Sequence, residues 1–185
     1  MNYRNLRPGT QFILDGNPYE VLEYNFEKKQ RRKPTVKLKI RNLRNGKTRQ
    51  YTARSHEEFE EADIEELPAE FIYHHRGEYW FKDPEDPSDR FKVEEEILEN
   101  IKDYLKEGLE VTLQKFKGEF INVKIPDKVD LEVTQAPPKV KGNTADGGTK
   151  KVTVETGIEI KTPLFIEKGD TIRVNTETGE YTERV

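Results

Sequence analysis

The most regular alternation of apolar and charged positions in this chain lies in residues 35–43. Apolar side chains occupy every second position there, at Val36, Leu38 and Ile40. The positions between them are cationic: Lys37, Lys39 and Arg41. A period of two that is kept along a whole run is typical of a β-strand with one buried and one solvated face. The sequence therefore predicts a strand whose exposed face is basic.

A second predicted strand precedes this one, in residues 19–26. The alternation assigns its apolar residues to two faces, with Tyr19 and Val21 on one and Leu22, Tyr24 and Phe26 on the other. Residues 27–34 join the two strands and contain only Glu, Lys, Gln, Arg and Pro. Two strands with a short polar connection predict a β-hairpin. At roughly 3.3 Å per residue, its end lies on the order of 20 Å from the domain core.

The hairpin belongs to the first of three predicted small β domains. Residues 1–64 contain short antiparallel strands separated by turn residues, including the pair Asn45-Gly46, which favours a two-residue hairpin turn. This pattern is typical of an SH3-like, or KOW-like, barrel.

The central predicted domain, residues 65–127, combines strands with one helix. Two aromatic runs, residues 71–73 and 79–81, flank a turn and predict a hairpin. In residues 94–106 the apolar side chains recur at intervals of three and four, which predicts an α-helix. Strands with one capping helix are typical of an OB barrel.

The C-terminal predicted domain, residues 128–185, shows strand-like alternation alone. Four apolar pairs mark its later strands: Val152 and Val154, Ile158 and Ile160, Leu164 and Ile166, Ile172 and Val174. We therefore expect a further small barrel. The predicted fold class is mainly β, with three small β-barrel domains.

Composition supports a folded chain and excludes cysteine chemistry. Charged residues make up 37% of the chain, but 9 Phe, 8 Tyr and 1 Trp distinguish it from disordered sequences. There is no cysteine, so disulfides and thiolate metal sites are excluded. No apolar run approaches the roughly 20 residues of a membrane span, so we expect a cytoplasmic protein without a membrane partner.

The net charge of −4 conceals an asymmetry between the two ends of the chain. Residues 1–64 hold 14 Lys/Arg and 9 Asp/Glu, a net charge of +5, whereas residues 65–185 hold 18 and 27, a net charge of −9. Five of the cations lie at the end of the predicted hairpin: Lys28, Lys29, Arg31, Arg32 and Lys33. A basic projection on an acidic body favours a polyanionic partner that is contacted at one place.

The sequence does not favour an enzyme or a metal site. Ser55 and His56 are neighbours in sequence, and adjacent side chains usually point apart, so they do not predict a nucleophile and its base. His74 and His75 lack a third ligand at suitable spacing. We expect no catalytic residues, no metal and no cofactor.

A long, unusual motif occupies the C-terminal domain. It comprises residues 151–157 (KVTVETG), 162–176 (TPLFIEKGDTIRVNT) and 179–181 (GEY). This motif closely resembles that of the bacterial elongation factor P family. Similar residues recur along the whole chain, at residues 7–9, 15–19, 42–43, 62–63, 77–80 and 129–131.

The resemblance implies an SH3-like domain followed by two OB domains, arranged in an L shape similar to tRNA. It implies a monomeric factor that binds the 70S ribosome between the P and E sites and contacts rRNA and the P-site peptidyl-tRNA. The end of the first hairpin would approach the peptidyl-transferase centre, stimulate peptide-bond formation and relieve stalling at polyproline stretches.

The resemblance also places the site residues, with one departure. Many relatives carry Lys-Pro-Gly-Lys-Gly at the end of the hairpin, with the second lysine extended by a β-lysyl or related group, and others carry a rhamnosylated arginine. Ungapped alignment of residues 19–43 places Arg31 at that position and Lys28 at the first lysine. Gln30 and Arg32 replace the glycines, which leaves open whether Arg31 is modified and by which enzyme.

We therefore expect two functional groups in the hairpin. The first, called the tip below, comprises residues 28–33 and contacts ribosome and tRNA through Arg31, Arg32, Lys28, Lys29 and Lys33. The second is a supporting basic stalk formed by Lys37, Lys39 and Arg41. The alternative is a general single-stranded RNA-binding OB-fold protein that uses Tyr73, Tyr79, Trp80 and Phe81 as an aromatic surface. Salt-sensitive binding to any RNA oligonucleotide would favour that alternative. Selective binding to 70S ribosomes would favour the translation factor.

Overall fold

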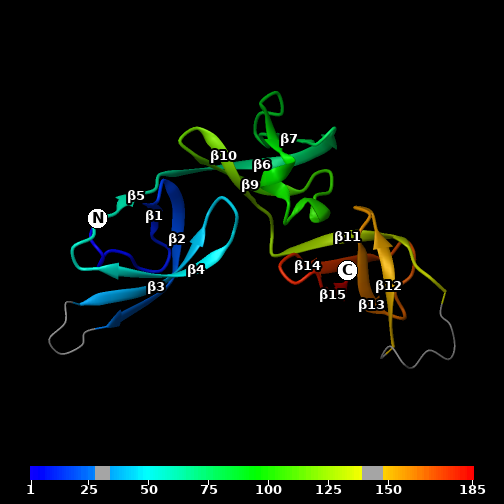
Figure 1. Ribbon diagram of the computed structural model, residues 1–185. Helices are drawn as coiled ribbons and strands as arrows, with labels where there is room; N and C mark the ends of the chain where they lie inside the picture. Colours follow the sequence, from blue (N-terminus) through cyan, green and yellow to red (C-terminus); the bar gives the residue numbers. More distant parts are fainter. Residues whose placement is uncertain (28–33, 139–147) are drawn as a thin grey trace. The chain divides into compact units, whose positions relative to one another are not determined.

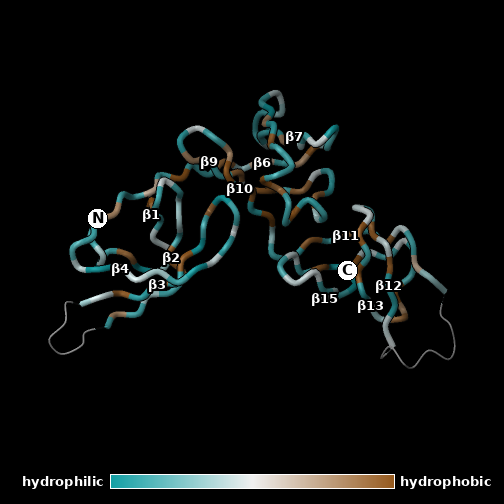
Figure 2. Tube along the Cα trace, viewed as in Figure 1, coloured by the Kyte–Doolittle hydropathy of each residue, from teal (hydrophilic) through white to brown (hydrophobic). Residues whose placement is uncertain are grey.

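The fold was obtained as a computed structural model, which describes residues 1–27, 34–138 and 148–185. Three five-stranded sheets make up the described chain (Figure 1), and apolar residues recur along their strands (Figure 2). The predicted mainly β fold class is confirmed. The chain divides into two compact units, residues 1–67 with 113–123 and residues 68–112 with 124–185. The predicted domain boundaries stay a prediction.

The first sheet has the strand order β4-β3-β2-β1-β5. Its strands are β1 (Gln11–Leu14), β2 (Asn17–Glu27), β3 (Thr35–Asn42), β4 (Thr48–Arg54) and β5 (Glu60–Glu61). The alternation predicted for residues 35–43 is confirmed, because Val36, Leu38 and Ile40 are fully buried. They belong to a core that also contains Phe12 and Phe59, whose rings meet edge to face at 5.5 Å.

The predicted faces of β2 are wrong beyond Val21. The register against β3 shifts between Val21 and Glu23, which marks a β-bulge at Leu22. Because a bulge inserts one residue, Tyr24 and Phe26 lie on the same face as Val21. Tyr24 packs against the core, and Phe26, nearer the end of the strand, is 45% exposed.

The second sheet has the order β10-β9-β6-β7-β8. Its strands are β6 (Ile64–His75), β7 (Glu78–Lys82), β8 (Arg90–Glu94), β9 (Glu110–Phe116) and β10 (Glu119–Lys124). The predicted aromatic hairpin is confirmed as β6 and β7, which pair in antiparallel fashion. Phe71, Tyr79 and Phe81 are buried on its inner face.

The α-helix predicted for residues 94–106 is wrong. This segment contains two 3₁₀ turns, η1 (Glu95–Leu98) and η2 (Lys102–Tyr104). Two of its backbone hydrogen bonds join residues three positions apart: Ile101 N–H donates to Leu98 O, and Tyr104 N–H donates to Ile101 O. The apolar residues 98, 101 and 104 repeat at the period of a 3₁₀ helix, which explains why they mimic a helical pattern.

The third sheet has the order β13-β12-β11-β14-β15. Its strands are β11 (Lys128–Gln135), β12 (Thr149–Val154), β13 (Glu159–Pro163), β14 (Thr171–Asn175) and β15 (Tyr181–Arg184). The strand predicted at Leu164 and Ile166 is wrong, because the chain turns after Pro163. Ile166 is nevertheless fully buried, so its apolar character reflects a core contact from a turn. The last strand, β15, was not predicted.

Arg173 joins β14 to both neighbouring strands. Its Nε and Nη2 donate to the two carboxylate oxygens of Asp130 on β11 at 2.7 and 2.9 Å, and Nη1 donates to Glu183 on β15 at 2.9 Å. The hydrogen bonds from Arg173 lower the pKa of the Asp130 carboxyl. This arrangement gives the motif residue Arg173 a structural role.

We expect Arg173→Gln to reduce stability at neutral pH and to have little effect in acid. A carboxyl whose native pKa is below its unfolded value of about 3.9 stabilises the fold above that value and stops doing so as the pH falls through the native pKa. Both side chains are partly exposed to solvent, which screens the ion pair, so we expect the loss of stability to be small. Thermal unfolding of both proteins across this pH range measures the effect. If the two proteins differed in melting temperature by the same amount in strong acid as at neutral pH, this prediction would be contradicted.

Candidate nucleic-acid interface

The predicted tip residues lie outside the described residues, so their arrangement stays a prediction. These residues are Lys28, Lys29, Arg31, Arg32 and Lys33. The strands on either side of them are described, and the Cα partners Glu27 of β2 and Thr35 of β3 form the pair nearest the tip. Figure 1 shows β2 and β3 leading to this segment.

Strand β3 is hydrogen-bonded on both sides. It pairs with β2 along one edge and with β4 along the other. Even Thr35, at the start of β3, has a partner in both neighbours, Glu27 and Arg54. Because the pairing and the buried face extend to the end of the strand, the segment that carries the tip starts from an ordered three-stranded base.

The exposed cations of β3 have carboxylate partners on β2. The pairs are Lys37–Glu27 at 2.9 Å, Lys39–Glu23 at 3.1 Å and Arg41–Glu20 at 2.6 Å. These three cations were predicted to form a basic stalk. That supporting role stays a prediction. In the structure each cation faces a carboxylate, so the positive charge of the stalk is balanced locally. Cross-strand pairs of this kind contribute only about 0.2–1 kcal/mol each.

The bulge at Leu22 explains why the sequence did not reveal this pairing. In a regular strand, Glu20 and Glu23 would lie on opposite faces, because their positions differ by an odd number. The inserted residue brings both onto the exposed face, where they meet Arg41 and Lys39. Ion pairing in the stalk therefore depends on a local irregularity that the hydrophobic pattern does not show.

Two residues near the hairpin were absent from the predicted site. The guanidinium of Arg7 lies over the ring of Tyr24, at 4.2 Å from its centroid. Phe26 presents an exposed ring close to the end of β2. Exposed aromatic and guanidinium groups are able to stack on nucleobases. A signal for Arg7 was present in the family-like residues 7–9.

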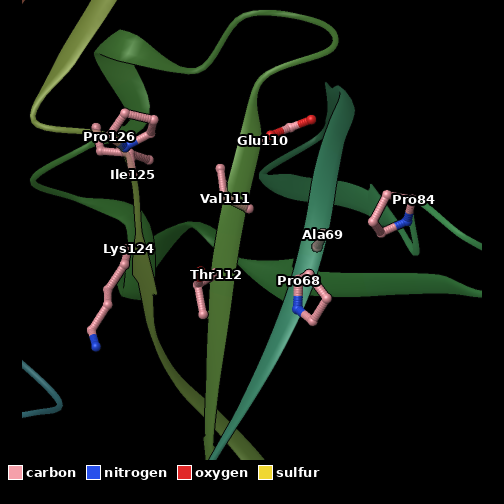
Figure 3. A pocket seen from close by; sticks show the side chains of 9 residues that line it. All are labelled: Pro68, Ala69, Pro84, Glu110, Val111, Thr112, Lys124, Ile125 and Pro126. Atoms are coloured by element: carbon pink, nitrogen blue, oxygen red, sulfur yellow. The ribbon is translucent and has the colours of Figure 1, made fainter.

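A pocket of about 490 Å³ lies at β6 and β9 (Figure 3). Its wall includes Pro68 and Ala69 of β6, Val111 and Thr112 of β9, and Pro126 after β10. The titratable side chains that line it are one carboxylate and one ammonium group, from Glu110 and Lys124. This set contains neither a nucleophile–base pair nor a metal-binding cluster.

Among the described residues, no group of His, Asp and Glu has an arrangement that could hold a metal ion. His74 instead stacks on the ring of Tyr79, with centroids 5.4 Å apart. No helix in the described segments is long and apolar enough to cross a membrane.

Three family models match successive parts of the chain. The Elongation factor P (EF-P) KOW-like domain matches residues 3–59, and the Elongation factor P (EF-P) OB domain matches residues 64–123. The model named Elongation factor P, C-terminal, matches residues 129–184. The matches therefore follow the chain in the order of the three sheets.

Similar proteins support the same assignment. The chain is 40% identical to elongation factor P of Finegoldia magna, over 98% of this chain and 97% of that protein. It is 38% identical to elongation factor P of Desulfatibacillum aliphaticivorans, over 100% of this chain and 98% of that protein. A solved structure of eukaryotic translation initiation factor 5A from Methanococcus jannaschii shares the fold, with a TM-score of 0.50 and 15% identity over 68% of this chain and 90% of that one. The chain belongs to the elongation factor P family, a family of translation factors.

Proposed function

We propose that this translation factor binds the 70S ribosome between the P and E sites and contacts rRNA and the P-site peptidyl-tRNA. There it stimulates peptide-bond formation and relieves stalling at polyproline stretches. Family membership supports a role in elongation. The hairpin of β2 and β3 supports the more specific proposal, because it is a paired, ordered base for a strongly cationic segment.

The observation that carries the proposal is the distribution of charge along the hairpin. The exposed cations of β3 are balanced by glutamates of β2. Residues 28–33 contain five cations and no acidic residue. Cationic groups attract RNA phosphates whatever the RNA sequence. A surface whose charges are balanced gains little binding energy from the phosphates. The hairpin therefore concentrates its attraction for RNA in the tip.

Modification of the tip is part of the proposal. Arg31 is the candidate site, and a tip-modifying enzyme would be a second partner. An unmodified arginine already offers a planar fork of donors that matches phosphate oxygens. Intact-mass spectrometry of the natively expressed chain decides whether a group is attached, and peptide mapping then assigns it to Arg31 or to another tip residue.

Co-sedimentation with ribosomes tests the proposed partner. We expect the chain to bind 70S ribosomes that carry a P-site tRNA and an empty E site, and to bind much more weakly when a deacylated tRNA fills the E site. Short single-stranded RNAs of mixed sequence serve as the comparison. Equal affinity for these RNAs and for ribosomes, with the same salt dependence, would favour the general RNA-binding alternative and contradict the proposal.

A further inference from the structure

The outer face of β6, β7 and β8 carries a stacked pair of aromatic rings. Tyr73 of β6 is the cross-strand partner of Trp80 of β7, and their rings are nearly parallel, with centroids 6.3 Å apart and planes at 23°. Tyr73 is 44% exposed. The neighbouring residues Tyr79 and Phe81 are buried on the inner face. The aromatic run in β7 thus divides between a core and an outer surface.

A register shift in β6 helps to form this pair. The shift lies between Phe71 and Tyr73 and marks a bulge at Ile72. Without it, these two residues would occupy the same face of β6. The bulge leaves Phe71 in the core and turns Tyr73 outward beside Trp80. We call the outer surface of Tyr73 and Trp80 the aromatic platform.

Cations lie beside the aromatic platform on β8. Lys92 is the cross-strand partner of Trp80. Its Nζ forms ion pairs with Oε1 of Glu78 at 3.2 Å and with Oε1 of Glu94 at 3.4 Å. Arg90 lies two residues away on the same face of β8 and is exposed. In the part of the chain that the structure describes, Arg90 has no ion pair. The platform therefore has a guanidinium available for an anion on one side.

The surroundings of the platform favour RNA over a protein partner. Protein interfaces usually bury a core from which charged residues are depleted. Here the charged residues Glu70, Lys82, Arg90 and Lys92 share the outer face of these strands. An unpaired nucleotide combines a flat base, which stacks on aromatic rings, with a phosphate, which accepts hydrogen bonds from guanidinium.

The position of the platform in the domain supports the same ligand. The family model assigns residues 64–123 to an OB domain, in which β7 and β8 are the second and third strands. OB folds commonly bind oligonucleotides on the face formed by these strands. We propose that the aromatic platform stacks an unpaired RNA base while Arg90 binds the adjacent phosphate. This contact is additional to the tip and does not depend on the proposed function.

The single tryptophan makes the proposal directly measurable. Because Trp80 is the one Trp in the chain, its fluorescence reports only on the platform. We expect a short oligoadenylate RNA to quench this fluorescence saturably, and an abasic RNA of equal length to leave it nearly unchanged. A Tyr73→Ala variant should bind about tenfold more weakly, as expected for the loss of one stacking surface.

Three variants separate the platform from other surfaces. Arg90→Gln should weaken binding and reduce the slope of log K against log salt by about 0.7, the value for one lost phosphate contact with single-stranded RNA. Phe165→Ala removes a comparably exposed ring, 49% exposed, and should bind like the parent chain. Arg31→Ala should also leave the quenching unchanged, which distinguishes this contact from the tip.

Several results would overturn the proposal. These are no quenching by oligoadenylate, equal quenching by abasic RNA, or undiminished affinity in Tyr73→Ala. Quenching by a neutral oligosaccharide but not by RNA would assign the platform to a different ligand. Circular dichroism of each variant confirms that the sheets are intact, so a loss of binding is attributed to the platform itself.

Discussion

An Arg31→Ala variant is expected to lose most of its ability to support synthesis of a polyproline reporter in cells that lack the native factor. The stalk cations are engaged by glutamates, so our proposal assigns the binding of RNA phosphate to the tip. A hydrogen bond to a charged group contributes about 1.5–3 kcal/mol, which corresponds to roughly 10- to 150-fold in binding or rate. Reporter yield, normalised to a control without consecutive prolines, measures the loss.

Two controls separate charge from the special geometry of arginine. Arg31→Lys keeps the charge but lacks the planar fork, so an intermediate yield is expected if bidentate binding matters. Gln30→Ala changes a neighbouring position without changing charge and should act like the parent chain. If Arg31→Ala supported the reporter at the parental level, the assignment of Arg31 would be wrong.

Replacing Phe12 by alanine is expected to lower the free energy of unfolding by about 3–5 kcal/mol. Phe12 is fully buried in the core of the first sheet. The centroid of its ring lies 5.5 Å from that of Phe59 and 6.3 Å from that of Tyr19. Truncation removes this burial and leaves a cavity. The buried face of the hairpin shares the same core, so the variant should also lose activity in proportion to its unfolded fraction.

Phe26→Ala is the matched control for this prediction. Phe26 lies in the same sheet but is 45% exposed, so its truncation should change stability by no more than about 0.5 kcal/mol. Denaturant unfolding of the full-length variants measures both effects. Similar midpoints for Phe12→Ala and the parent chain would show that Phe12 is not central to this core.

Hydrophobic periodicity predicted the regular strands well. The alternation in residues 35–43 located β3 and its buried face, and the aromatic runs at residues 71–73 and 79–81 located the hairpin of β6 and β7. In each case the side chains of one face pack into a core, so burial imposes the pattern that is seen in the sequence. Strands without such a pattern, such as β15, were missed, since its residues are partly or fully exposed.

The errors arose where local geometry departs from regular structure. The bulge at Leu22 reverses the predicted faces of the residues that follow it in β2, because a period of two cannot locate an inserted residue. The apolar spacing in residues 94–106 is compatible with both 3₁₀ and α geometry, and the structure has the former. For the site, sequence identified the cations of β3 but not their partners, because the pairing of Glu23 with Lys39 requires the bulge.

The central claim is that the hairpin acts through its tip and that the stalk cations serve mainly in cross-strand ion pairs. Translation of a polyproline message with purified ribosomes tests this claim most directly, with two triple variants of equal charge change. The stalk variant Lys37→Gln, Lys39→Gln, Arg41→Gln should retain most of the stimulation, whereas the tip variant Lys28→Gln, Arg31→Gln, Arg32→Gln should lose it. Loss of stimulation in the stalk variant, with full activity in the tip variant, would contradict the account.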